Sequence, residues 1–527
     1  MTSQMSRRSF VSAALSLGGG VVLAPSALLM GCGPGEPVTR QPWTPGSNEV
    51  PHYGGRLRLG LIGGSQAGNL DAHKPIATGS TIRGFALYSK LWEWSEDMSP
   101  RLALAEWAEP NRDASSWTIR LRKGLEFHHG KSVHAEDLVY SIRRLTDPEL
   151  ASSSARILSM IDRERIETLD PLTVRINLKP GKSFLPLPDA WVNFGGIVPT
   201  DYHPVNNPVG AGPYKLKSFR PGQRSLFTRF ENYFKTGKPY ADELEIIEFS
   251  DNLSRLLALQ SGQIHLANAI SPEQAPLFKT ETRADLLVSP AYGTQAFQMN
   301  LKHPPFDDQR VREAFRLLVD RQELVERVLH GYGRIANDLY SPKDPTSRTD
   351  LQQRNRDLER ARSLLKEAGH EHLSVELTTS GGNVAAALVL VDQAKRVGVD
   401  IRIHQVDETI FSGPLRNSWA LSPSGGGLGQ PYLHTATNTD SPLSGANRTN
   451  FEDARFSELY FRALAQPDIA LRTPLVHEMQ KIQYERGGLL IWGYADILDA
   501  VSRQVGGVAP ERSHFSTWRF ENIWLRA

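Results

Sequence analysis

Three histidines, His128, His129 and His134, lie close together in the segment FHHGKSVH. Imidazole is the commonest protein ligand of transition metals. A metal site needs three or four such ligands converging on one point with workable geometry. These residues alone leave two interpretations open: a metal site, or a structural turn that happens to be rich in histidine.

Signals for catalysis are weaker. GYGRIA, residues 331–336, fits a loose dinucleotide fingerprint, but it follows a helical pattern and the fingerprint requires a preceding strand. The sequence contains no G-x-S-x-G motif for a serine nucleophile. Carboxylates are numerous, but sequence does not place two of them at the separation that glycoside hydrolysis requires. We predict no catalytic residue and no cofactor, and a secreted hydrolase is the alternative from a different class.

The chain has one cysteine, Cys32, which follows an apolar stretch near the start. That stretch, residues 10–30, comes directly after Arg7 and Arg8. A basic start, an apolar run and an exit of small residues are typical of an export signal. The paired arginines also resemble a twin-arginine signal. A retained transmembrane anchor is the alternative, since about 20 apolar residues span a bilayer, but glycines, serines and a proline dilute this run.

The residues around the cysteine, Leu29-Met30-Gly31-Cys32, resemble the lipobox of bacterial lipoproteins. The resemblance implies that residues 1–31 are a signal peptide and that Cys32 is lipidated. Several acyl chains hold a protein firmly at a membrane. Residues 32–51 are rich in glycine and proline and are expected to form a flexible linker. We therefore expect a protein anchored through Cys32 in the periplasm or at the extracytoplasmic face of the cell membrane.

Length and composition limit the class of protein. A chain of 527 residues exceeds one typical core, so two or three lobes are expected. Hydrophobic residues make up 40% and charged residues 22%, as in ordinary soluble proteins. The net charge of +2 argues against a nucleic-acid surface, which shows a concentrated basic excess.

The pattern of apolar residues predicts mixed secondary structure. Alternation predicts strands at residues 56–62, 115–124 and 172–179. Helical spacing follows from residue 133, with Leu138, Ile142 and Leu145 on one face. Further helices are expected in the segment that begins at Phe306, with Val311, Phe315 and Leu318 on one stripe, then from Asp320 to a stop at Gly331, and at 357–369. Residues 373–407 read as strand, helix and strand, a parallel βαβ unit. This combination predicts an α/β protein in more than one lobe.

Four blocks of sequence carry a resemblance to a known family. They are WTIRLRKGLEFHHG followed by AEDL (117–138), VGAGPYKL (209–216), LQSGQIHLA (259–267) and MNLKHPPFDDQRVREAFRLLVDRQELVERVLHGYG (299–333). In this order and spacing they resemble the extracytoplasmic solute-binding proteins of peptide-type ABC importers, the oligopeptide, dipeptide and nickel group called family 5. The resemblance covers roughly residues 52–527. The family's own pattern has His at position 128 and Asp at 129, which favours the structural turn, and we predict no metal site.

The resemblance implies an α/β fold of the periplasmic-binding-protein type: a two-lobed clamshell (class II, cluster C type) with an extra small domain. Domain I is expected to combine residues 52–87, 191–290 and 496–527, domain II to be an insertion at 88–190, and domain III to cover 291–495. The chain would cross between the large lobes near Pro290–Gln295 and near Tyr494–Ala500, and these two crossings would be the hinge.

The resemblance also implies a function. The protein is expected to be a monomeric binder, not an enzyme, that captures a peptide or a small amino-acid-derived solute in the cleft and delivers it to an ABC permease with its ATPase. The alternative ligands are an opine-like conjugate, a glycoside and a chelated metal. A third possibility is a receptor or chaperone with no permease attached.

The residues that contact the solute carry fewer sequence signals. Many oligopeptide binders of the family have a Trp followed three residues later by an Asp that pairs with the peptide's amino terminus. Placing Trp419 on that Trp puts Ser422 where the Asp belongs, and no acid follows until Asp440. An ammonium buried without a carboxylate is costly. Either another acid supplies the charge, with Asp71 as the candidate, or the ligand lacks a free amine and ordinary peptides bind weakly.

Further cleft candidates follow the first strand, lie at the lobe crossing, or lie in the loop after Trp419; they are Gln66, Asn69, Tyr292, Gln295, Ser424, Gly425 and Tyr432. The backbone from Ser422 to Gly429 would offer N–H groups to an anionic or hydroxyl-rich ligand, or it is only a flexible loop; both interpretations stay open. Core packing is an equal alternative for each aromatic candidate. Four other tryptophans are assigned to the core: Trp92, Trp94, Trp107 and Trp117.

Overall fold

The computed structural model describes residues 49–63, 68–152, 154–155, 157–192, 195–425, 429–512 and 516–527. Residues 42–527 form one compact unit. The predictions for the signal peptide, for Cys32, for Gln66 and for most of the linker lie outside the described residues. Within them, none of the helices has the length and hydropathy that a bilayer span requires.

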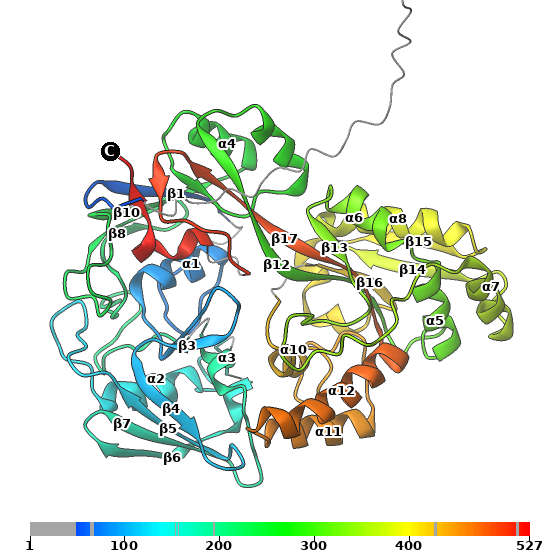
Figure 1. Ribbon diagram of the computed structural model, residues 1–527, viewed down its shortest axis with the longest axis horizontal. Helices are drawn as coiled ribbons and strands as arrows, with labels where there is room; N and C mark the ends of the chain where they lie inside the picture. The colour runs from blue at the N-terminus through cyan, green and yellow to red at the C-terminus, as the bar shows by residue number, and fades with distance from the viewer. Residues whose placement is uncertain are drawn as a thin grey trace, which may run out of the picture. The chain divides into compact units, whose positions relative to one another are not determined.

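One large sheet runs through this unit (Figure 1). Its strands are ordered β15-β14-β16-β12-β17-β11-β1-β10-β9-β8, with β13 pairing on β17. Their bounds are β1 Arg56–Ile62, β8 Tyr214–Arg220, β9 Arg224–Arg229, β10 Glu243–Phe249, β11 Leu266–Ala267, β12 Ala284–Met299, β13 Gly333–Ile335, β14 Ser374–Thr379, β15 Asp400–Gln405, β16 Leu421–Ser424 and β17 Leu489–Ser502.

The first strand confirms the prediction from alternation. β1 has the predicted bounds, and Leu57, Leu59 and Leu61 are buried in the core. It pairs in parallel with β10 on one side and β11 on the other. β1 is therefore an interior strand of the sheet, and its alternating burial is typical of a sheet with one face packed against the core.

The long strands β12 and β17 connect the two ends of this sheet. They pair antiparallel from Ala284–Ser502 to Gln298–Leu489, with a register shift between Ser289 and Gly293. Tyr292, inside this irregularity, has a left-handed φ of 54°. β13 pairs with β17 opposite the same region. The two predicted crossings are therefore adjacent strands whose pairing shifts register twice, between Ser289 and Gly293 and between Gln295 and Ala296. Their action as a hinge stays a prediction.

A second sheet lies wholly within residues 88–190. Its order is β4 (Ala105–Pro110), β5 (Ser116–Leu121), β7 (Thr173–Leu178) and β6 (Ile161–Asp170). α2 (Ala135–Leu145) contacts β6 and β7 and buries Leu138, Ile142 and Leu145 completely, as predicted. The assignment of Trp107 to the core was wrong, because it lies on the edge strand β4 and is 36% exposed.

The helices of the second half also follow their sequence patterns. The chain forms α5 (Gln309–Leu318), α6 (Arg321–Val328), α7 (Leu358–Glu367) and α8 (Val384–Lys395). Asp320 caps α6 by accepting a hydrogen bond from the Glu323 N–H (3.0 Å). Gly331 has a φ of 81°, the left-handed conformation expected of a helix stop. β14 and β15, on either side of α8, pair in parallel, which confirms the βαβ unit.

The remaining elements complete the unit. They are α1 (Thr78–Leu87), β2 (Trp92–Trp94), β3 (Pro100–Leu102), α3 (Leu187–Trp191), α4 (Asn252–Gln260), α9 (Glu408–Phe411), α10 (Tyr432–Asn438), α11 (Ala454–Leu464), α12 (Ile469–Arg486), β18 (Val505–Gly506) and β19 (Trp524–Leu525). α11 packs on α12. The Leu185 N–H, just before α3, donates to the Leu464 carbonyl at the end of α11 (3.1 Å). The segment around α3 therefore touches the α10–α12 region directly.

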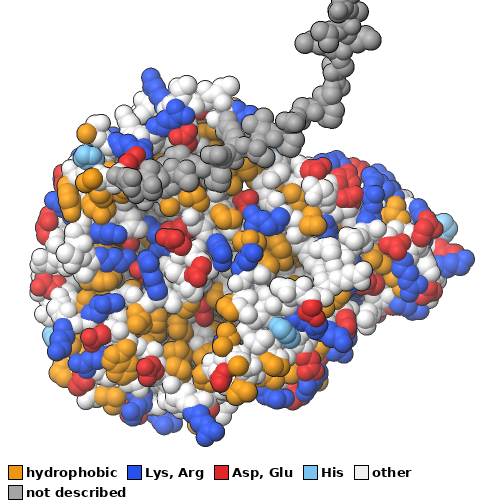
Figure 2. Space-filling model, in the orientation of Figure 1, with side chains coloured by type: hydrophobic (Ala, Val, Ile, Leu, Met, Phe, Trp, Pro, Cys, Tyr) orange, Lys and Arg blue, Asp and Glu red, His pale blue; other side chains and the backbone are white. Residues whose placement is uncertain are grey.

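The surface carries charges of both signs. On the face shown in Figure 2, Lys and Arg side chains are interspersed with Asp and Glu. This mixture agrees with the small net charge of +2. This face therefore presents no continuous basic surface of the kind that binds nucleic acid.

Candidate ligand-binding site

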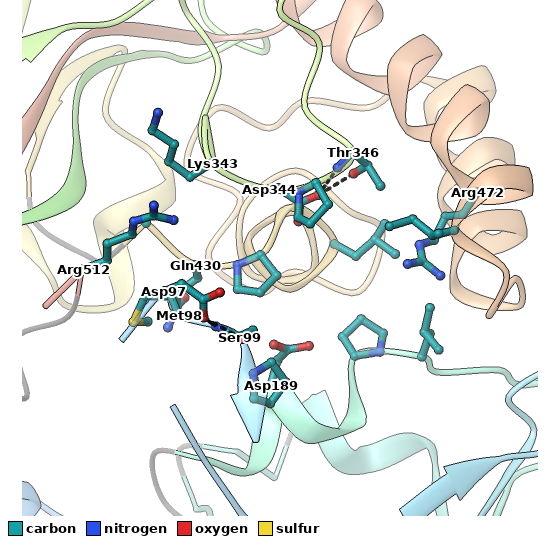
Figure 3. Close-up of a pocket in the computed structure, with 18 residues that line it drawn as sticks. Asp97, Met98, Ser99, Asp189, Lys343, Asp344, Thr346, Gln430, Arg472 and Arg512 are labelled. Carbon is teal, nitrogen blue, oxygen red and sulfur yellow. Dashed lines mark hydrogen bonds between the residues drawn. The ribbon is translucent and has the colours of Figure 1, made fainter. Parts of the chain in front are cut away.

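A cavity of about 270 Å³ lies where the α3 segment meets the α10–α12 region. One wall comes from the β2–β3 turn and α3, and the other comes from the loop 343–346 and the starts of α10 and α12 (Figure 3). The polar residues that line it are Asp97, Ser99, Asp189, Lys343, Asp344, Thr346, Gln430, Arg472 and Arg512. Apolar walls with a few convergent polar groups are the usual composition of a small-molecule site.

Asp97 is fixed in the turn between β2 and β3. Its carboxylate accepts hydrogen bonds from the Ser95 hydroxyl, the Ser99 N–H (3.0 Å) and the Ser99 hydroxyl (2.6 Å). These bonds lower the pKa of Asp97 to about 2. Asp97 is therefore a permanent negative charge at the cavity wall.

Asp189 lies on α3 and has a different environment. The residue is only 8% exposed, and its Oδ1 is buried with no hydrogen-bond partner in the described structure. Burial, and then the negative charge of Asp344, raise the pKa of Asp189 to about 7. Figure 3 shows its carboxylate pointing from α3 toward the loop that carries Asp344.

Asp344 is held by its own loop. Its Oδ1 accepts from the Thr346 N–H (2.7 Å) and hydroxyl (2.6 Å), and its Oδ2 accepts from the Tyr432 N–H (2.7 Å) at the start of α10. The bonds fix this carboxylate opposite α3. Asp189 and Asp344 are thus two acids from distant parts of the chain that line the same cavity.

Three cations share the cavity wall with these acids. The Arg472 guanidinium donates to the carbonyls of Gln466 (2.7 Å) and Pro467 (2.8 Å). The Lys343 ammonium lies 5.4 Å from the centre of the Tyr292 ring. The backbone N–H of Arg512 donates to the Glu96 carbonyl (3.0 Å), which ties its segment to the β2–β3 turn. Charges of both signs therefore surround the same space.

The predicted ligand residues lie elsewhere. Of the nine that the structure describes, none is among the residues lining this cavity. Asp71 is 9% exposed, and both its oxygens bind the Arg144 guanidinium (2.8 and 2.7 Å). The Asn69 side-chain amide donates to the Lys74 carbonyl (2.9 Å), and its backbone N–H donates to the Ser80 hydroxyl on α1 (2.8 Å). The Asp71 carboxylate is already neutralised, which leaves it poorly suited to a ligand amine.

Two of the aromatic candidates have structural contacts. Tyr432 is fully buried, stacks on Tyr340 with ring centres 5.1 Å apart, and donates to Gln483. Trp419 is half-buried, and its indole N–H donates to the Phe411 carbonyl (3.3 Å). For Tyr432 the structure favours the core-packing alternative, because its side chain has no exposed surface.

The structure brings the other candidates together at the end of β16. Ser424 pairs with Ala296 on β12, and Ser422 is buried behind it. The Gln295 Oε1 lies 2.7 Å from the position that a Cβ on Gly425 would occupy. Tyr292 lies beside the cavity rather than in it, under the side chains of Arg334 and Lys343. These residues form a group next to the cavity, and their contact with ligand stays a prediction.

Sequence reasoning missed the acids of the cavity. Asp97 and Asp344 stand in SEDMSP and SPKDPT, where turn-forming residues surround a carboxylate. That local signal marks a turn, and nothing in it brings three acids so distant in sequence to one place. Among the described residues, no group of three or more His, Cys, Asp or Glu side chains is arranged to hold a metal ion.

The comparisons with known proteins decide the family. Residues 97–450 match the family described as bacterial extracellular solute-binding proteins, family 5 middle. The chain belongs to this family. The glutathione-binding protein GsiB of Salmonella paratyphi A is 27% identical over 430 residues, 73% of this chain and 82% of GsiB. GsiB of Escherichia coli O1:K1 is 28% identical over 359 residues, 65% of this chain and 68% of that protein.

Solved structures show the same fold. NikA of Brucella suis, in complex with Fe(III)-EDTA, has a TM-score of 0.78 at 21% identity, over 89% of this chain and 100% of NikA. AgaA of A. tumefaciens R10, in complex with agropinic acid, has a TM-score of 0.77 at 24% identity, over 90% of this chain and 99% of AgaA. The mixed α/β, two-lobed arrangement predicted from sequence is confirmed by these neighbours.

Membership settles several broad predictions. Proteins of this family bind solutes outside the cytoplasm and work with ABC permease and ATPase subunits. They are binding proteins rather than enzymes, so the alternative of a secreted hydrolase is removed.

Proposed function

We propose that this protein captures a peptide or a small amino-acid-derived solute in the cavity between α3 and the α10–α12 region and delivers it to an ABC permease. The observation that carries the proposal is the composition of the cavity, which is lined by three acids, Asp97, Asp189 and Asp344, and by three cations, Lys343, Arg472 and Arg512. A ligand with charges of both signs complements such a wall.

The size of the cavity favours a compact ligand. Small-molecule sites usually enclose about 300–1,000 Å³, and this cavity of about 270 Å³ lies at the low end. A dipeptide or a similar conjugate suits this volume better than a long peptide. The relatives support the class of ligand, because GsiB is a glutathione-binding protein and a dipeptide-binding neighbour from Pseudoalteromonas was solved with Met-Leu.

The group at the end of β16 is proposed as a second set of ligand contacts. Tyr292, Gln295, Ser424 and Gly425 lie near the strand crossing, and the Gly429 N–H, which belongs to a residue lining the cavity, donates to the Ala291 carbonyl (2.8 Å). This bond connects the crossing to the cavity wall. A ligand that contacts both would favour one arrangement of the strands by differential binding.

Non-peptide ligands are the alternative, as the two complexes with agropinic acid and Fe(III)-EDTA illustrate for neighbouring proteins. The test is mass spectrometry of any solute that co-purifies after gentle isolation. It is followed by calorimetric titration with glutathione, Met-Leu, agropinic acid and a nickel–histidine chelate. We expect tight binding of glutathione or Met-Leu, recovered chemically unchanged, and a higher Tm in its presence.

A cavity-filling variant locates the site. Gln430 lines the cavity, so Gln430→Trp should abolish binding while the protein stays folded. Gln322→Trp, at an exposed position on α6, is the matched control and should bind normally. Binding that survives in Gln430→Trp would place the solute elsewhere, and failure of every peptide-type probe to bind the wild-type protein would overturn the proposed ligand class.

A further inference from the structure

Asp189 is the cavity acid with an unpartnered carboxylate oxygen. Asp97 receives bonds from Ser95 and Ser99, and Asp344 receives bonds from Thr346 and Tyr432. The Oδ1 of Asp189 is buried and receives none within the described structure. A buried acceptor without a donor costs free energy in the ligand-free protein, and such groups in native structures call for an explanation.

We propose that Asp189, facing Asp344 across the cavity, binds the primary ammonium group of the solute. This inference rests on the proposed function, because it places the ligand in the same cavity. An ammonium group has three N–H donors and no acceptor. One donor satisfies the orphan oxygen of Asp189, and the positive charge is attracted by both carboxylates.

The surrounding charges agree with a cation at this point. The charged groups that line the cavity together with Asp189 are Asp97, Lys343, Asp344, Arg472 and Arg512. The positive charge of Arg472 acts to lower the pKa of Asp189, but its guanidinium already donates to the carbonyls of Gln466 and Pro467. Lys343 lies over the Tyr292 ring. Neither cation forms an ion pair with Asp189 in the described part of the chain, so the ligand is left to supply the counter-charge.

The position also answers a question raised by the sequence. The segment after Trp419 has Ser422 where an amine-binding acid was expected, and Asp71 is paired with Arg144. Asp189 supplies a carboxylate to the cavity from α3 instead. Lys343 and Arg512, on the left in Figure 3, then remain for a carboxylate of the same ligand.

The experiment compares free-amine and N-acetylated probes on two proteins. Wild-type protein and Asp189→Asn are titrated calorimetrically with glutathione, Met-Leu and their N-acetyl forms. We expect N-acetylation to weaken binding to the wild-type protein about 10- to 100-fold, the range for a charge-assisted hydrogen bond. Asp189→Asn should lose a similar factor for the free amines and should no longer distinguish the two forms.

The controls separate this inference from the proposed function. Asp285→Asn removes a half-buried carboxylate that pairs with Arg503 and does not line the cavity, and this variant should bind like the wild-type protein. Wild-type affinity of Asp189→Asn for the free amines, or equal affinity of the wild-type protein for N-acetyl forms, overturns the inference and leaves the proposed function standing. Failure of the wild-type protein to bind any of these probes overturns both. The N-acetyl comparison uses only wild-type protein, so it holds even if the variant folds poorly.

Discussion

Buried carboxylates in this protein differ in whether a cation accompanies them. Asp71 pairs with Arg144, whereas Asp189 and Asp499 have no ion pair in the described structure. Burial raises the pKa of both unpaired acids to about 7. Asp499 accepts bonds from the Ala269 N–H (2.8 Å) and the Thr517 hydroxyl (3.2 Å), which give it a structural role between β17 and its neighbours. The Oδ1 of Asp189 is buried without any partner in the described structure, and this difference supports its assignment as a ligand group.

The first prediction concerns the stability of the ligand-free protein. An unfolded Asp has a pKa near 4, and burial raises that of Asp189 to about 7 in the folded protein. The folded state therefore binds more protons between these values, and its stability falls as pH rises from about 4 to 7. Asp189→Asn should remove this loss and raise the free energy of unfolding at pH 8 by about 1–3 kcal/mol, with little change at pH 4. Urea unfolding at both pH values measures it.

The same variant should gain stability and lose ligand affinity, a pair of effects that a purely structural acid would not produce. Asp285→Asn is again the control, since this half-buried carboxylate is paired with the exposed Arg503. A variant that is less stable than the wild-type protein at pH 8 would contradict the prediction and assign Asp189 to folding.

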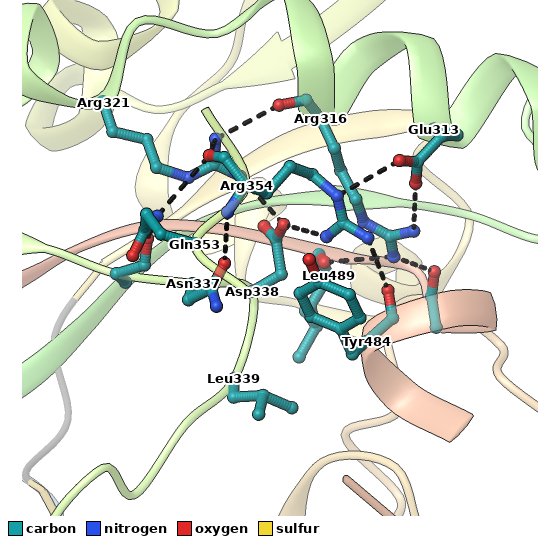
Figure 4. Close-up of polar contacts among 12 residues, drawn as sticks. Glu313, Arg316, Arg321, Asn337, Asp338, Leu339, Gln353, Arg354, Tyr484 and Leu489 are labelled. Carbon is teal, nitrogen blue, oxygen red and sulfur yellow. Dashed lines mark hydrogen bonds and ion pairs between the residues drawn. The ribbon is translucent and has the colours of Figure 1, made fainter. Parts of the chain in front are cut away.

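At the scale of secondary-structure elements, a buried ion network joins α5 and α6 to the long loop that follows β13 (Figure 4). Asp338 is fully buried and binds the guanidinium groups of Arg321 (2.8 Å) and Arg354. Arg354 also binds Glu313 on α5 (3.2 Å), and Arg316 donates to the Leu489 carbonyl at the start of β17 (3.3 Å). The network holds the loop that leads to Lys343 and Asp344, so it positions one wall of the cavity.

The second prediction removes the centre of this network. Burial by itself would raise the pKa of Asp338, but the guanidinium groups of Arg321, Arg354 and Arg316 outweigh it and lower the pKa. Asp338→Asn keeps the shape and tolerates the left-handed φ of 57°. It should destabilise the protein by about 3–5 kcal/mol near pH 7, because it leaves buried cations uncompensated. Because the pKa is lowered on folding, this contribution exists above about pH 4 and is lost as pH falls below that value.

The matched control is Asp350→Asn, an exposed carboxylate that pairs with Arg348. Exposed pairs contribute little, so the urea midpoint of this variant should stay near that of the wild-type protein. Equal stability of Asp338→Asn and Asp350→Asn at pH 7 would show that the network does not support the fold.

At the scale of the whole molecule, we expect ligand binding to change the dynamics of the crossing of β12 and β17. The pairing is irregular between Ser289 and Gly293, and β13 adds to β17 at the same level. A solute held by Asp189 and Asp344 bridges segments on both sides of the cavity. The third prediction is that a bound solute slows amide hydrogen exchange in residues 290–295 and 494–500 more than in β5 and β7 of the second sheet. Uniform slowing, or none at the crossing, would contradict the proposed hinge.

The fourth prediction concerns attachment. If Cys32 carries the lipid anchor, Cys32→Ser should abolish incorporation of labelled fatty acid and move the protein from the membrane to the soluble fraction. Solute binding should be unchanged, because the cavity is formed by residues 97–512. Twin Arg7→Lys and Arg8→Lys replacements test the export route separately, by accumulation of the uncleaved protein. Membrane association that persists in Cys32→Ser would show that another segment anchors the chain.

Sequence alone determined the regular elements and the family. The bounds of β1, the buried face of α2 and the parallel unit β14–α8–β15 follow from local periodicity, since burial repeats every two residues in a strand and about every 3.6 in a helix. The family followed from blocks of motif in a fixed order, and residues 97–450 confirm it. The periodicity and the motifs are both patterns among residues close in sequence, so they can be recognised before the fold is known.

Only the tertiary structure decided which acids face the ligand. Asp97, Asp189 and Asp344 come from a turn, a short helix and a loop, and their meeting depends on how the α3 segment packs against α10–α12. The same packing pairs Asp71 with Arg144 and buries Tyr432 against Tyr340. Whether a carboxylate is neutralised or left without a partner depends on residues distant in sequence. A local sequence pattern contains no information about which distant residues will lie beside it.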